Sequence, residues 1–100
     1  MAMVYDITSK LKFNEDPVLK INDIELTVRS DADVLLQIID IMQTKGEMEG
    51  AKQCISLLFS EEDREKLIGL HLKMEDFMEV VKAAVSMALG EDPDGETEKN

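Results

Sequence analysis

The stretch that most constrains this chain is residues 74–89, where apolar side chains follow one uninterrupted helical pattern. On a helix, at about 100° per residue, they cover roughly 200° of the circumference, which is wider than one contact with a core requires. Gly90 and Pro93 then provide stop signals, so we expect a helix over residues 74–89. Its wide apolar face has two open explanations. Either its own domain encloses it, or part of it docks another chain.

Upstream, the sequence predicts a β-hairpin over residues 18–29. Asn22-Asp23 separates two short apolar runs and suits a two-residue turn, because this dipeptide tolerates a positive φ. In that register four apolar side chains share one face, with Ile21 opposite Ile24 and Leu19 opposite Leu26.

A first helix is expected over about residues 31–45. Ser30 is a candidate start, and Asp31 and Asp33 fall in the first turn, where negative charge favours the positive end of the helix dipole. Gly46 is expected to end this helix.

Two further helices are expected over about residues 47–59 and 61–72. Gly50 weakens the start of the first, and Ser60 is expected to cap the second. Together with residues 74–89, these elements predict an α+β, mainly α fold. An N-terminal hairpin, with or without an extra extended arm, packs on a bundle of about four helices.

The two ends of the chain differ from this domain in pattern. Residues 1–14 show a period of two that fits an extended arm or an edge strand, carried by Tyr5, Ile7, Leu11 and Phe13. Residues 91–100 are acidic and lack large apolar side chains, so we expect a disordered tail. The single folded domain is therefore expected over residues 15–90.

Charge and cysteine content restrict the classes of partner. The chain has 22 acidic and 11 basic residues and a formal charge of −11, which disfavours nucleic acids and anionic membranes as partners. No apolar run is long enough to span a bilayer. A single cysteine and the lack of a cationic leader lead us to expect a cytoplasmic location.

Candidates for catalysis are few. His71 is the only histidine and Cys54 the only cysteine, and both fall on expected helices among apolar neighbours. A Cys54–His71 catalytic pair is therefore weaker than the plain alternatives of a buried free cysteine and a histidine that interacts with a helix dipole. We expect no enzyme activity, no cofactor and no metal site.

The order of the elements resembles the small tail assembly chaperones of long-tailed bacteriophages and prophages. The resemblance covers about residues 7–90 and includes the acidic tail, but no catalytic motif. It rests on the hairpin over residues 18–28 and on two flanking segments, Leu11-Lys12-Phe13-Asn14-Glu15 and Leu70-His71-Leu72-Lys73-Met74-Glu75-Asp76-Phe77.

The resemblance implies a temporary role in tail assembly. Such a chaperone shields apolar helices of the tape-measure protein in the host cytoplasm and is absent from the finished virion. A longer form made by ribosomal frameshifting recruits tail-tube subunits. Glu98-Lys99-Asn100 is compatible with the codons GAA AAA AAC, which contain the slippery heptamer A AAA AAC.

A surplus apolar face also leads us to expect a homo-oligomer. The residues expected to bind partners are Leu36, Met74, Phe77, Met78, Val81 and Val85. Leu36 has an alternative, which is packing on the hairpin. An alternative function is an acidic inhibitor that mimics the charge of nucleic acid and blocks a host DNA-binding enzyme.

Overall fold

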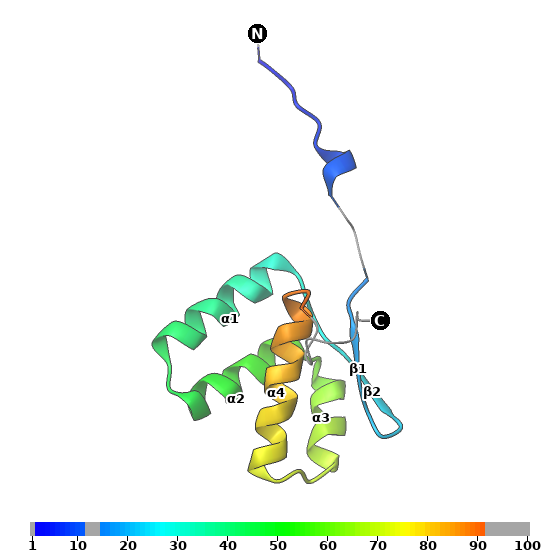
Figure 1. Ribbon diagram of the computed structural model, residues 1–100, viewed down its shortest axis with the longest axis vertical. Helices are drawn as coiled ribbons and strands as arrows, with labels where there is room; N and C mark the ends of the chain where they lie inside the picture. Colours follow the sequence, from blue (N-terminus) through cyan, green and yellow to red (C-terminus); the bar gives the residue numbers. More distant parts are fainter. Residues whose placement is uncertain (1, 12–14, 92–100) are drawn as a thin grey trace.

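The computed structural model describes residues 2–11 and 15–91. The fold is α+β and mainly α, with a two-stranded antiparallel hairpin followed by four helices, as the sequence predicts (Figure 1). The elements are the 3-10 turn η1 Thr8–Lys10, strands β1 Val18–Ile21 and β2 Ile24–Thr27, and helices α1 Ala32–Thr44, α2 Glu47–Leu58, α3 Glu61–Gly69 and α4 Met74–Ala88.

Helix α2 lies at the centre of the body. It packs against α1, α3 and α4, while the hairpin lies beside α3 (Figure 1). The largest fully buried side chains come from three parts of the chain, which are β2 with the residue after its end, α1, and the end of α2, and they belong to one core cluster. They are Leu26, Val28, Ile38, Leu58 and Phe59.

The hairpin has the predicted register. Ile21 pairs with Ile24, and Leu19 pairs with Leu26. Asn22 has a φ of 56°, which explains why an asparagine suits the first turn position. Only Leu26 of these strand residues is fully buried, so the apolar face of the hairpin is held to the body mainly through β2.

The contact between β2 and α3 is polar as well as apolar. Ser60 caps α3 as predicted, because its Oγ accepts a hydrogen bond of 3.2 Å from the backbone N–H of Asp63. The Asp63 carboxylate in turn accepts a bond of 3.0 Å from the backbone N–H of Thr27 and lies 3.5 Å from Lys66 Nζ. Asp63 is the only buried charged residue in the described parts of the chain, and its bonds compensate that burial.

The start of α1 differs slightly from the expectation. The helix begins at Ala32 with Asp31 at the N-cap position, and Ser30 does not cap it. Instead, the Ser30 hydroxyl donates a hydrogen bond of 2.7 Å to Asp16 Oδ1. Ser30 therefore ties the end of the hairpin to the segment before it.

Helix α3 is shorter than expected. It ends at Gly69, whereas the sequence pattern suggested continuation to about Leu72. His71 has a φ of 54°, a left-handed conformation that cannot continue a helix. Leu70 and Leu72, on either side of it, both pack against the core, which the periodicity alone did not reveal.

The described part of the N-terminal segment does not form the edge strand that was one expectation for it. Residues 2–11 form no strand, and their only regular structure is the turn η1. All of them are exposed, and Figure 1 shows this segment extending away from the helices. Phe13 and all but the first residue of the disordered tail expected over residues 91–100 lie outside the described residues.

Candidate functional site

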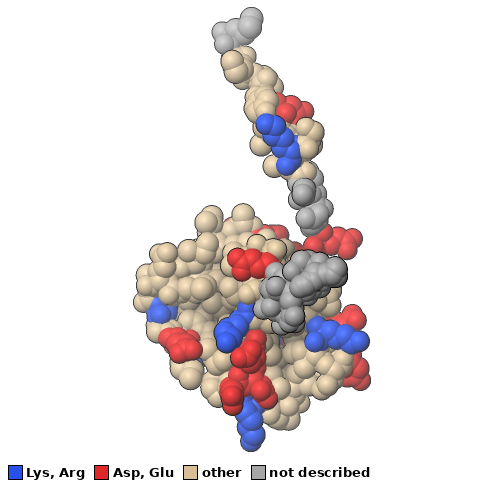
Figure 2. Space-filling view, viewed as in Figure 1, with Lys and Arg blue, Asp and Glu red and all other residues tan. Residues whose placement is uncertain are grey.

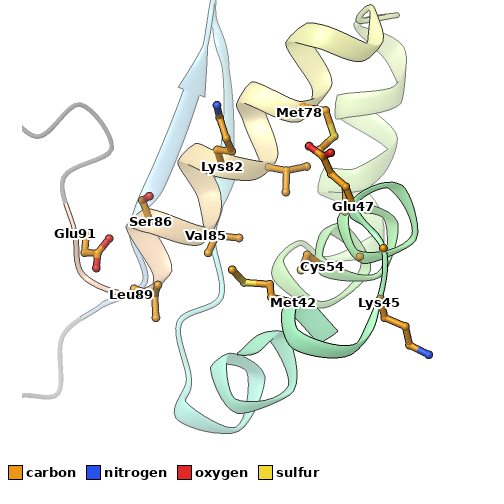
Figure 3. Close-up of a pocket in the computed structure, with 14 residues that line it drawn as sticks. Met42, Lys45, Glu47, Cys54, Met78, Lys82, Val85, Ser86, Leu89 and Glu91 are labelled. Atoms are coloured by element: carbon orange, nitrogen blue, oxygen red, sulfur yellow. The ribbon is translucent and has the colours of Figure 1, made fainter. Parts of the chain in front are cut away.

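An apolar groove of about 520 Å³ opens between α4 and the connection from α1 to α2 (Figure 3). Its floor is formed by Gly50, Ala51 and Cys54 of α2. These three residues are buried, and their side chains are small. Because α1 and α4 both pack on α2 but this part of α2 does not fill the space between them, a groove remains.

The walls of the groove are apolar and partly exposed. Met42 extends from α1 toward Val85 of α4 (Figure 3), and Leu89 lies at the far end of α4. Met42 is 59% exposed and Leu89 is 44% exposed, so solvent reaches both walls. Met78 and Val81 complete the α4 wall. The walls expose apolar surface that the domain itself leaves uncovered.

Charged residues surround this apolar interior. Lys45, Glu47, Lys82 and Glu91 lie at its rim, and the charged ends of Lys45 and Lys82 point away from the groove (Figure 3). Lys82 lies 3.3 Å from Glu79 in an exposed ion pair on α4. The interior therefore offers no charged partner, and it suits an apolar ligand.

Ser86 also lies in this region. Ser86, a polar residue of α4, is half-buried and lines the groove. The α4 wall of the groove is therefore not made of apolar side chains alone.

A second uncovered apolar surface lies on α1. Leu36, Ile39 and Met42 are three residues apart and are 67%, 42% and 59% exposed. We call these three residues the α1 strip. The alternative that Leu36 packs on the hairpin is wrong, because most of its side chain is exposed and it is not among the residues that pack against the core. Because Met42 belongs to both, the α1 strip continues into the groove, and Figure 2 shows few charged side chains over α1 in this view.

The expected partner-binding residues do not all gather at the groove. Met78, Val81 and Val85 line it, although Val81 is only 7% exposed. Met74 is 55% exposed but is not among the lining residues. Phe77 packs against the core and is half-buried. A partner-binding role for any of them stays a prediction.

The predictions from the sequence missed the floor of the groove and its α1 wall. Gly50, Ala51 and Cys54 share one side of a helix, and this spacing of small residues was a usable signal for close approach or for a depression. Gly50 was interpreted only as a weak helix former. Met42 continues the apolar pattern of its own helix, and nothing near it in the sequence shows that α4 lies opposite.

Among the residues that the structure describes, none forms a catalytic arrangement with Cys54. Burial raises the pKa of its thiol above the usual value, so the nucleophilic thiolate is disfavoured. His71 is exposed in the connection between α3 and α4, and no hydrogen bond joins it to Cys54 in the described structure. Within residues 2–11 and 15–91, no three side chains of the metal-ligating types are grouped to hold an ion.

None of the helices in the described parts of the chain combines the length and apolar character that crossing a membrane requires. Comparison of the chain with protein-family models, with curated proteins and with solved structures found no match.

Proposed function

We propose that this chain is a tail assembly chaperone of a long-tailed phage or prophage, which binds apolar helices of the tape-measure protein in the host cytoplasm. The observation that carries the proposal is the open apolar groove, which continues into the α1 strip. The role is one of binding, without catalysis. The chaperone leaves before the virion is complete.

The groove has the chemistry expected for a helical client. Met78, Val81 and Val85 are spaced three and four residues apart along one wall, a spacing that complements the ridges of an amphipathic helix. Methionine side chains at positions 42 and 78 adapt to ligands of varied shape. The acidic surface keeps the chaperone and its client in solution.

Co-expression with the tape-measure protein of the same phage tests this function. Wild-type chain should raise the soluble yield of the client several-fold. Met42→Glu places a charge in the groove wall and should abolish most of that gain. Because Met42 is already 59% exposed, the substitution should leave the fold intact.

Met48→Glu is the matched control. Met48 is 57% exposed, close to the exposure of Met42, but it does not line the groove. It should retain the wild-type effect on client yield. No gain with wild-type chain, or equal loss with both variants, would overturn a groove-based chaperone function.

A longer form of the chain is part of the proposal and recruits tail-tube subunits. Sequencing the gene through the codons for Glu98-Lys99-Asn100 should reveal the A AAA AAC heptamer and an open −1 frame beyond the stop codon. Mass spectrometry of tagged protein should then detect a minor longer product with a junction at Lys99. Lack of all three would remove the frameshifted form.

The acidic inhibitor is the second candidate function, and the net charge of −11 favours it. Many of the acids, however, lie in the first turns of helices, including Glu61, Glu62, Glu75 and Asp76, where the helix dipole already accounts for them. An inhibitor should bind a basic nuclease in a salt-sensitive way, and Met42→Glu should not weaken it. That pattern would replace the chaperone function.

A further inference from the structure

The N-terminal segment presents apolar side chains that its own chain does not cover. Met3, Tyr5 and Ile7 are 92%, 66% and 43% exposed, and Val4 among them is 88% exposed. Side chains two residues apart share one side of an extended backbone, so Met3, Tyr5 and Ile7 form an apolar row when the arm is extended. Leu11 is 48% exposed beyond the turn. We call residues 2–11 the arm. A continuous apolar row of this kind gains free energy when another surface removes it from water.

The arm also differs from the rest of the chain in charge. Lys10 balances Asp6, so the arm is neutral, while the other residues of the chain carry the whole net charge of −11. Two bodies of this acidity repel each other when they approach directly, whereas a neutral arm reaches the body of a second copy without that repulsion. Charge therefore favours contact through the arm.

Local contacts give the arm a preferred shape before it meets any partner. The Asp6 carboxylate accepts hydrogen bonds from the backbone N–H of Thr8, at 2.9 Å, and from the Thr8 hydroxyl. These bonds lower the pKa of Asp6. Lys10 Nζ lies 5.4 Å from the centre of the Tyr5 ring. Less conformational entropy is lost when a segment that is partly ordered in this way binds.

We propose that the arm of one copy docks in the groove of a second copy, with the apolar row of Met3, Tyr5 and Ile7 facing the wall formed by α4. The dimensions agree. Helix α4 has 15 residues and is therefore about 22 Å long. The extended residues before η1 reach about 20 Å. Each copy has one arm and one groove, so reciprocal exchange closes a dimer.

This contact requires no client, and its test uses the purified full chain alone. The photoreactive phenylalanine analogue p-benzoylphenylalanine replaces Tyr5, and equal amounts of ¹⁵N-labelled and unlabelled chains are mixed before irradiation. The expected product joins position 5 of one isotopic form to Met42 or Met78 of the other. Cross-links formed only within one chain, or to other surfaces, would overturn the proposal.

Sedimentation equilibrium supplies a second measurement. The double substitution Tyr5→Asp with Ile7→Asp should raise the dimer dissociation constant at least tenfold. Ile68→Asp is the control, because Ile68 is an apolar residue of α3 that is 70% exposed and does not line the groove. A wild-type chain that remains monomeric at high concentration, or a dimer unaffected by the arm variant, would contradict arm exchange and leave the chaperone proposal separately testable.

Discussion

The two ends of helix α2 contribute in opposite ways to the molecule. At its C-terminal end, Leu58 and the following Phe59 are completely buried. Backbone carbonyls there are also satisfied, because Arg64 Nη1 donates to Ser56 O at 2.9 Å and to Phe59 O at 3.1 Å. Toward its N-terminal end, Gly50 and Ala51 form the floor of an open groove.

Side-chain volume explains the difference. Large side chains at the C-terminal end occupy the space between neighbouring elements and produce a closed core. Toward the N-terminal end, the small residues Gly50, Ala51 and Cys54 leave the space between α1 and α4 open, although both helices pack on α2. One helix therefore organises both the stable core and the candidate binding surface, and substitutions at its two ends should have different consequences.

The largest expected effect is at the closed end. Phe59→Ala should lower the free energy of unfolding by about 3–5 kcal/mol, because it leaves a cavity in the core. Met42→Ala at the groove should change it by less than about 0.5 kcal/mol, because Met42 is 59% exposed. Urea denaturation measures both. Similar losses would show that the groove is as tightly packed as the core.

The next effect is at the junction between the hairpin and α3. Asp63→Ala removes the acceptor for the Thr27 N–H and should cost about 1–3 kcal/mol. Asp63→Asn retains an oxygen acceptor and should cost less. Glu62→Ala, an exposed change in the same helical turn, is the control. Equal urea midpoints for Asp63→Ala and Glu62→Ala would show that the Thr27 bond does not hold the hairpin.

A smaller effect of opposite sign is expected at the open end of α2. Gly50→Ala should raise the free energy of unfolding by about 0.5–1 kcal/mol, because alanine is the better helix former. The added Cβ would lie 3.6 Å from Ile41 Cγ2, an ordinary contact. Gly46→Ala, at the N-cap position of the same helix, should give no gain. A destabilised Gly50→Ala variant would mean that the floor tolerates no added volume.

The smallest expected effect depends on pH and on Cys54. Its folded-state pKa is raised above the ordinary 9.0 by burial, so the unfolded chain loses the thiol proton first as the pH rises. The contribution of the neutral Cys54 thiol to the free energy of unfolding is complete below about pH 9. Above that pH the free energy of unfolding falls, until the pH passes the folded-state pKa of Cys54. Urea denaturation of wild type and Cys54→Ala at about pH 7 and pH 10 should show the larger decline in wild type. An identical decline would show that Cys54 does not titrate differently in the two states.

Local features of the fold were predictable because short segments encode them. The Asn22-Asp23 turn, the pairing of Leu19 with Leu26 and the Ser60 cap depend on spacing within a few residues. Errors arose at element ends, where longer-range contacts compete with local preference. Ser30 bonds to Asp16 and does not cap α1, and a left-handed His71 ends α3 early.

The candidate site was predictable only in part. The apolar excess of α4 indicated uncovered surface, and Met78 and Val85 of that apolar face line the groove. Phe77 followed the same pattern but packs against the core, because periodicity defines a face without showing what lies against each part of it. A charged substitution at Met42 is therefore a cleaner test of binding than one at Phe77.

The sequence by itself determined the order of the elements, the register of the hairpin and the acidic character of the chain, since these follow from neighbouring residues and composition. Only the tertiary structure decided that Met42 and Val85 face each other over a floor of small residues. It also brought Thr27 to Asp63, 36 positions along the chain. Such contacts depend on how helices pack in space, and side-chain volumes across several elements set that packing together.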